Sequence, residues 1–247
     1  MLSSTLALQN FVGRLAALSP LSNKDAAVLL RLPVETTRLR GNSDILAPGD
    51  THDWACLVVS GIVARFVQLR DGSRQYTAFH MPGDMADIHR VATAAAGSAL
   101  QTLSTAIIIR VSTKELKAAA LASPAITRAF WAYAAVDAAL LSQWVVNLGR
   151  RDAKSRMAHF LCEIGIRSEQ SGLGDRTDFI LDASQAQIGD ALGLTPVHVN
   201  RTLKSLKESK LVSTDGRIIR VLNWPALAAL GDFDPTYLQL DNRREAA

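Results

Sequence analysis

The sequence predicts an α+β protein in which a β-rich N-terminal half is followed by a long helix and a small helical domain with a β-hairpin. Three patterns support this prediction. Residues 34–112 contain short apolar runs separated by Gly-Asn, Pro-Gly-Asp, Ser-Gly and Asp-Gly-Ser turns. Residues 129–148 form one long, mostly apolar segment. Residues 184–221 combine two closely joined helices with a hairpin.

The composition is that of a soluble protein with a basic C-terminal segment. The chain has 247 residues, 48% of them hydrophobic and 20% charged, with a net charge of +4. Such a charge permits a polyanionic partner without requiring one. Residues 195–220, however, hold six basic side chains against two acidic ones, a net +4 in this segment alone: Arg201, Lys204, Lys207, Lys210, Arg217 and Arg220 against Glu208 and Asp215.

The two cysteines, Cys56 and Cys162, exclude a disulfide scaffold and a four-cysteine iron–sulfur cluster. We expect both thiols to be reduced and buried, as in a cytoplasmic protein. The N-terminus "MLSSTLALQNFVGRL" lacks the charged region and cleavage site of a signal peptide. The predicted location is therefore the cytoplasm.

The N-terminal half is expected to begin with helical residues 4–32, followed by strands to residue 112 that a short helix or loop interrupts near 89–100. Many short strands with regular turns are typical of a sandwich or barrel. Further helices are expected over 114–122, 125–149 and 152–168, with a loop over 169–178. The predicted divisions are a β-rich domain at 1–123, the long helix at 124–150, a helical domain with a β-hairpin at 151–235 and a tail at 236–247.

The long helix is apolar enough to be mistaken for a membrane span. Asp137 at its centre, however, would cost a few kcal/mol in hydrocarbon, so we expect no membrane. A mostly apolar helix in a soluble protein buries its surface against a partner. The positions expected to form a dimer interface are Phe130, Tyr133, Leu141, Trp144 and Leu148.

Residues 184–221 predict a winged helix-turn-helix. Ser184 and Gln187 have the spacing of a capping box, and Gly193 permits the turn that follows. Thr195 is a good N-cap, and Pro196 occupies the first helical position. The buried stripe of the second helix is expected to be Val199, Leu203 and Leu206. In such a unit the second helix enters the DNA major groove, and its early residues contact base edges.

These elements together resemble the Crp/Fnr family of bacterial transcription regulators over nearly the whole chain. "LVVSGIVARFVQLRDGSRQ" and "MPGDMAD" are similar to the strands and pocket turn of its β-roll, a double-stranded jelly roll. "SQAQIGDALGLTPVHVNRTLKSLKESKLVSTDGRIIRV" is similar throughout to its DNA-binding unit. The resemblance implies a homodimer on palindromic double-stranded DNA, with RNA polymerase as a further partner. The candidate DNA-binding residues are Ser184, Gln185, Thr195, Val197, His198, Asn200, Arg201, Lys204 and Arg217.

The second helix departs from the family pattern at one position. Arg201 matches the arginine that recognises guanine, but Val197 replaces the glutamate commonly found four residues earlier. Valine cannot accept a hydrogen bond from cytosine, although it can pack on a thymine methyl group. The expected half-site therefore differs from that of the best-known members.

The predicted effector pocket departs further. Ile88 replaces the ribose-binding glutamate of cyclic-AMP-responsive members, and Gly97-Ser98 replaces their Arg-Ser pair. Without the arginine a cyclic phosphate lacks its strongest partner, so the effector is not expected to be cyclic AMP. The candidate pocket residues are Gly83, Asp84, Asp87, His89, Arg90 and Ser98.

No cofactor, metal site or catalytic residue is predicted, because no nucleophile–base pair, phosphate-binding loop or metal-ligand cluster is evident. The protein is expected not to be an enzyme. Two alternatives remain open. His80 and His89 near the pocket could serve a haem- or small-ligand-binding sensor of the same architecture. The second alternative is an interaction protein in which the helix-turn-helix has only a structural role.

Overall fold

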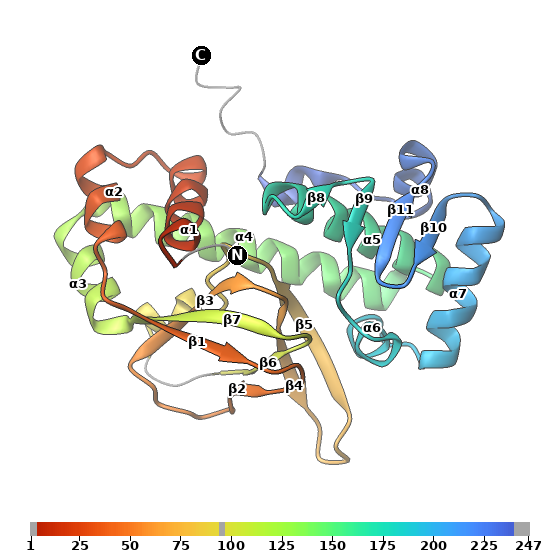
Figure 1. Ribbon diagram of the computed structural model, residues 1–247, viewed down its shortest axis with the longest axis horizontal. Helices are drawn as coiled ribbons and strands as arrows, with labels where there is room; N and C mark the ends of the chain where they lie inside the picture. The colour runs from red at the N-terminus through yellow and green to blue at the C-terminus, as the bar shows by residue number, and fades with distance from the viewer. Residues whose placement is uncertain (1–3, 94–96, 240–247) are drawn as a thin grey trace. The chain divides into compact units, whose positions relative to one another are not determined.

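The computed structural model describes residues 4–93 and 97–239, with elements in the predicted order (Figure 1). The helices are α1 (Ser4–Leu18), α2 (Asn23–Leu30), α3 (Thr113–Ala122), α4 (Pro124–Arg150), α5 (Ala153–Gln170), α6 (Gln185–Leu192), α7 (Pro196–Glu208) and α8 (Trp224–Leu230), with 3-10 turns η1 (Ile88–Val91) and η2 (Pro235–Leu238). The strands are β1 (Val34–Leu39), β2 (Asp44–Leu46), β3 (Trp54–Ser60), β4 (Val63–Gln68), β5 (Arg74–His80), β6 (Ala99–Thr102), β7 (Ala106–Ser112), β8 (Gly174–Asp175), β9 (Asp178–Ile180), β10 (Val212–Asp215) and β11 (Ile218–Val221).

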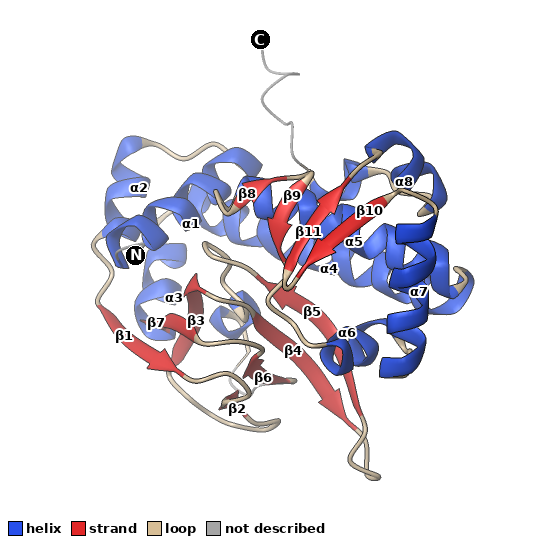
Figure 2. Ribbon diagram, turned by 45° about the vertical axis from the view of Figure 1, so that its right-hand side comes forward, coloured by secondary structure: helices blue, strands red, loops and turns tan. Residues whose placement is uncertain are grey.

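The strands of the N-terminal half form two antiparallel sheets, with strand orders β1-β7-β3 and β2-β6-β4-β5 in the described part of the chain (Figure 2). Alternate residues of β3 enter different cores because successive side chains of a strand point to opposite faces. Leu57 and Val59 pack with α1 and α3, whereas Cys56 and Val58 pack with Leu100 of the other sheet. This arrangement confirms the predicted β-roll.

The C-terminal half contains the predicted helix pair and hairpin, but its sheet is larger than expected. In the described residues the strand order is β10-β11-β9-β8, so the predicted loop at 169–178 contains β8 and leads into β9. The hairpin turn consists of Gly216 and Arg217, and Gly216 has a φ of +57°, which suits glycine. A further helix that was not predicted, α8, is capped by the side chain of Asn223.

Contacts divide the chain into two compact units, and the division differs from the predicted domain boundaries. One unit contains Met1–Val67, Phe79–Leu140 and Thr236–Ala247, and the other contains Gln68–Ala78 and Leu141–Pro235. The division therefore falls within α4 rather than at its ends. Of the predicted tail, residues 236–238 belong to η2 and residues 240–247 lie outside the described part. Cys56 and Cys162 are free and buried, as expected.

Candidate DNA-binding surface and sensor pocket

The helix-turn-helix is built from local capping interactions. The backbone N–H of Gln187 donates to the Ser184 hydroxyl at 3.2 Å, and the Gln187 side chain accepts from the Ser184 N–H at 2.7 Å. Gly193 ends α6 in the left-handed conformation with φ +62°. Thr195 then caps α7 by accepting from the His198 N–H at 3.2 Å, with Pro196 in the first turn. These contacts confirm the predicted helix boundaries.

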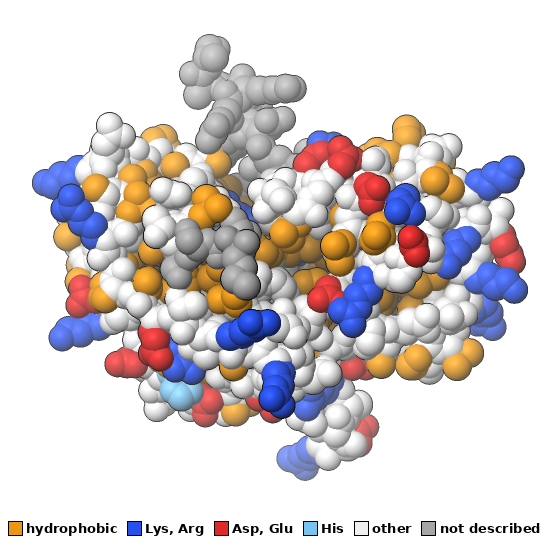
Figure 3. All heavy atoms as spheres, in the orientation of Figure 1, with side chains coloured by type: hydrophobic (Ala, Val, Ile, Leu, Met, Phe, Trp, Pro, Cys, Tyr) orange, Lys and Arg blue, Asp and Glu red, His pale blue; other side chains and the backbone are white. Residues whose placement is uncertain are grey.

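Two faces of α7 differ sharply in exposure. Val199, Thr202 and Leu206 are buried, whereas Leu203 is half-buried. Thr202 therefore takes the central place in the buried stripe that was predicted for Leu203. On the outer face Val197 is 79% exposed, and Arg201 and Lys204 are also exposed. Figure 3 shows Lys and Arg side chains gathered at the right-hand end of the molecule, where α7 lies in Figure 1. The outer face is therefore free to contact DNA.

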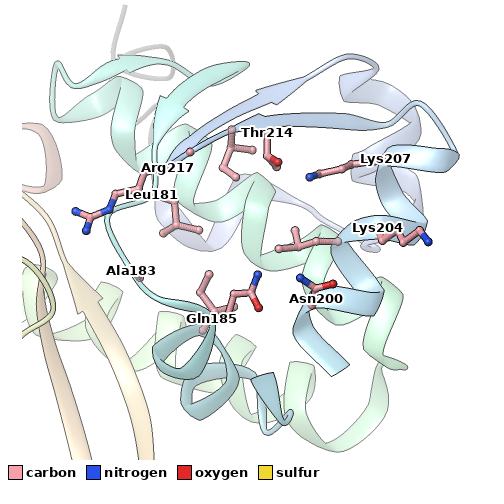
Figure 4. A pocket seen from close by; sticks show the side chains of 12 residues that line it. Leu181, Ala183, Gln185, Asn200, Lys204, Lys207, Thr214 and Arg217 are labelled. Atoms are coloured by element: carbon pink, nitrogen blue, oxygen red, sulfur yellow. The ribbon is translucent and has the colours of Figure 1, made fainter. Parts of the chain in front are cut away.

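A hollow of about 350 Å³ lies between α6, α7 and the β10–β11 hairpin (Figure 4). Four predicted DNA-binding residues line it, namely Gln185, Asn200, Lys204 and Arg217. In Figure 4 the side chains of Gln185 and Asn200 point into this space from neighbouring helices. The hollow is open and has basic groups on its walls, so it suits the phosphate backbone of DNA better than an apolar ligand.

Two polar side chains outside the predicted set also line the hollow, those of Lys207 on α7 and Thr214 on β10. The signal for Lys207 was present in the sequence, because this residue belongs to the basic segment 195–220 and lies one turn after Lys204. Thr214 had no such signal, because its position depends on how the hairpin folds back toward α7.

Weak ion pairs hold some of the basic groups. Arg217 contacts the Asp182 carboxylate, and the Lys204 amine lies 3.8 Å from Glu208. Exposed pairs of this kind contribute about 1 kcal/mol or less, so a phosphate can replace the carboxylate. Among residues 4–93 and 97–239, Arg201 and Lys207 have no carboxylate partner. Their charges are directly available to DNA.

The remaining predicted DNA-binding residues lie at the helix starts. Ser184 and Thr195 are exposed and cap α6 and α7, and His198 is half-buried in the first turn of α7. The free backbone N–H groups at these helix ends favour phosphate oxygens. All nine predicted residues therefore belong to the helix pair or the hairpin turn.

The predicted effector pocket in the β-roll contains charged groups that are already engaged. Gly83 takes a φ of +87° in the turn, and Asp84 next to it is buried. The Asp84 carboxylate accepts from the Met81 N–H at 2.6 Å and from the Arg14 guanidinium of α1. Asp84 therefore holds the turn and α1 together.

Asp87 and Arg90 are the two pocket residues with unsatisfied polar atoms. Asp87 Oδ1 accepts from the Cys56 N–H at 2.7 Å, and Arg90 donates to the His52 carbonyl. Within the described residues, Asp87 Oδ2 and Arg90 Nε and Nη1 are buried without a hydrogen-bond partner. Burial raises the pKa of Asp87 to about 7, although the nearby Arg90 and Arg65 charges oppose the increase.

The other candidates are less enclosed. Burial and the Arg65 charge lower the pKa of His89 from its usual value. Ser98 is half-buried just before β6, and Gly97 before it is exposed. Besides Arg90, a second arginine lies near the predicted pocket. This residue, Arg65 on β4, forms two hydrogen bonds of 2.9 Å with Asp137 on α4. Arg65 is not among the predicted pocket residues.

Three of the five predicted dimer-interface residues face the interior of their own chain, so the prediction was wrong for them. Phe130 is 5% exposed in the core beside α1 and β3. The Tyr133 ring packs against Phe11, and its hydroxyl accepts from the Met85 N–H at 3.0 Å. Trp144 is 6% exposed and donates to the buried Glu163 on α5 at 3.1 Å. Both sides of α4 are apolar, which is why spacing alone did not identify the outer side.

The outer side of α4 has its own regular apolar pattern. Trp131, Ala138 and Val145 are spaced by seven residues. Three residues after each of them lies a further apolar residue: Ala134, Leu141 and Leu148, respectively. Trp131 is 71% exposed and Val145 62% exposed, whereas Leu148 is half-buried. We name these six residues the α4 seam. Of the predicted interface residues, Leu141 and Leu148 belong to it.

By length and composition, α4 is the one helix in the described part of the chain that would suffice to cross a membrane. Only 17% of its most apolar window is buried within the chain. The Asp137 carboxylate, bound to Arg65, lies near its centre.

Comparisons with known proteins agree with this architecture. Residues 155–230 match the Crp-like helix-turn-helix domain. The chain is 30% identical to the nitrogen fixation regulation protein FixK of Azorhizobium caulinodans over 177 residues, which cover 70% of this chain and 68% of that protein. It is 24% identical over 212 residues to the fumarate and nitrate reduction regulatory protein of Vibrio cholerae, covering 86% of this chain and 82% of the relative.

The solved structure of FixK2 from Bradyrhizobium japonicum aligns with a TM-score of 0.72 at 27% identity, covering 81% of this chain and 98% of that one. The order of β-roll, long helix and winged helix-turn-helix in this chain thus agrees with its similarity to known regulators. The chain belongs to the Crp/Fnr family of DNA-binding transcription regulators.

Proposed function

We propose that this regulator binds a palindromic operator as a homodimer whose subunits pair in parallel along the α4 seam. The observation that carries the proposal is the heptad pattern of the seam, in which every residue except the half-buried Leu148 is exposed: Trp131, Ala134, Ala138, Leu141, Val145 and Leu148. A seven-residue apolar repeat on one side of a helix is the pattern of a two-stranded coiled coil. The small residues Ala134 and Ala138 would allow the two helices to approach closely.

In this dimer each α7 helix enters the major groove of one half-site. Arg201 donates to guanine O6 and N7, and Val197 packs on a thymine methyl group. Asn200 lies beside Arg201 and can donate to and accept from adenine in the same groove. Because Val197 cannot accept a hydrogen bond from cytosine, the half-site differs from that of members with a glutamate there.

The phosphate contacts come from the walls of the hollow and the helix ends. Lys204 and Lys207 on α7 and Arg217 in the hairpin turn contact the backbone on either side of the groove. Free backbone N–H groups in the first turns of α6 and α7, which follow the caps Ser184 and Thr195, add further donors. These contacts position the protein, whereas Arg201, Val197 and Asn200 provide the sequence preference.

The β-roll does not use cyclic AMP and holds no haem in this proposal. The residues that an effector would contact are Asp87 and Arg90, because each keeps buried polar atoms without a partner among the described residues. A Soret band in the absorbance of the purified protein would identify the haem alternative. The protein acts in the cytoplasm, has RNA polymerase as a further partner and catalyses no reaction.

The seam is tested by placing a charge on it. Val145→Glu should convert the dimer to a monomer at micromolar concentration and weaken binding to palindromic DNA, as measured by light scattering and fluorescence anisotropy. Val146→Glu is the matched control, because Val146 is also exposed but lies beside the seam. A wild-type protein that is monomeric at that concentration, or equal behaviour of the two variants, would contradict the proposal.

A further inference from the structure

Arg156 connects the ends of two helices that are far apart in the sequence. From the first turn of α5, its Nε donates to the carbonyl of Asn147 at 3.1 Å and its Nη2 to that of Leu148 at 2.8 Å, both at the end of α4. Its Nη1 donates to the carbonyl of Leu192, the last residue of α6. One guanidinium thus joins the seam helix to the turn that precedes α7.

The position of Arg156 is explained by these contacts and not by its own helix. A cation in the first turn of α5 is unfavourable there, because the N-terminal end of a helix carries partial positive charge. The carbonyl groups at the C-terminal ends of α4 and α6 lack helical partners and carry partial negative charge. A planar group with five donors can satisfy carbonyls from both helices at once, whereas a lysine has one point charge.

The surrounding contacts leave little freedom at this junction. A Cβ atom on Gly193 would lie 3.2 Å from Leu148 Cδ2 and 3.4 Å from Arg156 Nη1, so α4, α5 and the helix turn meet at van der Waals distance. The Asn147 side chain donates back to the Arg156 carbonyl at 3.2 Å. Trp144 also donates to Glu163, which ties α4 to α5 one turn earlier.

We propose that Arg156 is a positioning residue that sets the direction of α7 relative to the α4 seam, and thereby the half-site spacing that the dimer accepts. This inference rests on the proposed homodimer. The two α7 helices can match two half-sites only if each is held rigidly to the dimer axis. Adding one base pair between half-sites moves them by about 3.4 Å and rotates one around the DNA axis, so a rigid dimer discriminates between spacings.

The test uses the full-length protein and duplexes that carry two copies of the half-site selected by the wild type. The distance between half-sites is varied from one base pair shorter to two longer, and a duplex with one half-site serves as reference. Arg156→Gln removes the guanidinium and its charge, whereas Arg156→Lys keeps the positive charge but removes the planar group. Arg150→Gln is the control, because it removes an exposed charge beside the same junction.

Arg156→Gln should bind the preferred spacing about tenfold more weakly, because at least two charge-assisted hydrogen bonds to carbonyls are lost. For Arg156→Gln, the affinity for the preferred half-site spacing divided by the affinity for the neighbouring spacing should fall toward one. The half-site motif from a binding selection should remain that of the wild type. The affinity ratio of Arg156→Lys should lie between those of the wild type and Arg156→Gln, and Arg150→Gln should keep the wild-type ratio.

A dimeric Arg156→Gln protein that keeps the wild-type spacing ratio would overturn the inference, even with a lower melting temperature, because the arginine would then only stabilise the fold. If Arg156→Gln fails to fold, the ratio measured for Arg156→Lys decides in the same way. Failure of the proposed homodimer would be visible in the wild-type protein itself, as a monomer or as binding without spacing preference. That result would overturn both proposals.

Discussion

Arg65 of β4 and Asp137 of α4 form a bidentate ion pair in which both nitrogen–oxygen distances are 2.9 Å. The Arg65 side chain is 9% exposed and the Asp137 side chain 27% exposed. The pair attaches the β-roll to the middle of the helix that bears the seam. A charge that would be costly in the apolar stretch of α4 is thereby neutralised.

Removing one member of this pair should destabilise the protein more than removing both. Asp137→Ala should lower the free energy of unfolding by about 2–4 kcal/mol, because Arg65 would remain buried without its counter-ion. Arg65→Met combined with Asp137→Leu should restore most of that loss. Urea unfolding followed by fluorescence measures both. Glu35→Ala is the control, since its 3.7 Å pair with Arg110 is largely exposed and should contribute about 1 kcal/mol or less.

Asp87 should make the β-roll less stable as the pH rises. Its pKa in the folded protein is about 7, above the usual aspartate value of 3.8, so between these two pH values the folded state holds a proton that the unfolded state has lost. Stability from this group is therefore complete below about pH 4 and decreases as the pH rises through 7. Asp87→Asn keeps the acceptor for the Cys56 N–H and removes the titration.

The measurement is the difference in unfolding free energy between Asp87→Asn and the wild type from pH 5 to 8. The stability of the variant relative to the wild type should increase from pH 5 to about 7, by up to a few kcal/mol, and then level off. A difference that does not change with pH would mean that Asp87 titrates normally in the folded protein.

Arg201→Ala should change the sequence preference, whereas Lys207→Ala should not. Loss of a bidentate guanine contact costs about 1–3 kcal/mol on the cognate site and relaxes preference at one base pair of each half-site. Loss of a phosphate contact by Lys204→Ala or Lys207→Ala weakens binding to all sequences and reduces the salt slope by about one per subunit. Val197→Glu should shift the selected half-site by restoring an acceptor for cytosine.

A binding selection on randomised DNA at fixed salt, followed by titrations at several salt concentrations, distinguishes these roles. The outer face of α7 would not recognise bases as proposed if Arg201→Ala selected the wild-type motif.

Cyclic AMP should not bind with a dissociation constant below about a millimolar, because its buried phosphate would lack an arginine partner. Arg65 is occupied by Asp137, and Gly97 stands where the family pattern has arginine. Calorimetry with cyclic AMP measures this directly, and micromolar binding would show that another group, such as Arg90, neutralises the phosphate. Arg90→Gln would then abolish that binding.

The sequence by itself determined the elements that depend on local chemistry. Ser184 with Gln187 specifies where α6 begins, Gly193 where it ends, and Thr195 with Pro196 where α7 begins, because each cap forms within a few residues. The exposed side of α7 followed from the same helical period. The order of β-roll, long helix and winged helix-turn-helix was also predictable, since turns and apolar runs are short-range patterns.

Only the tertiary structure decided which side of α4 faces its own chain. Phe130 and Trp144 are no less apolar than Leu141 and Val145, but the first two pack against α1 and α5 and the last two remain exposed. The unsatisfied atoms of Asp87 and Arg90, and the reach of Arg156 to a carbonyl 36 residues away, are equally invisible in the sequence. Burial and long-range hydrogen bonding depend on which segments the fold brings together, and no local period encodes that.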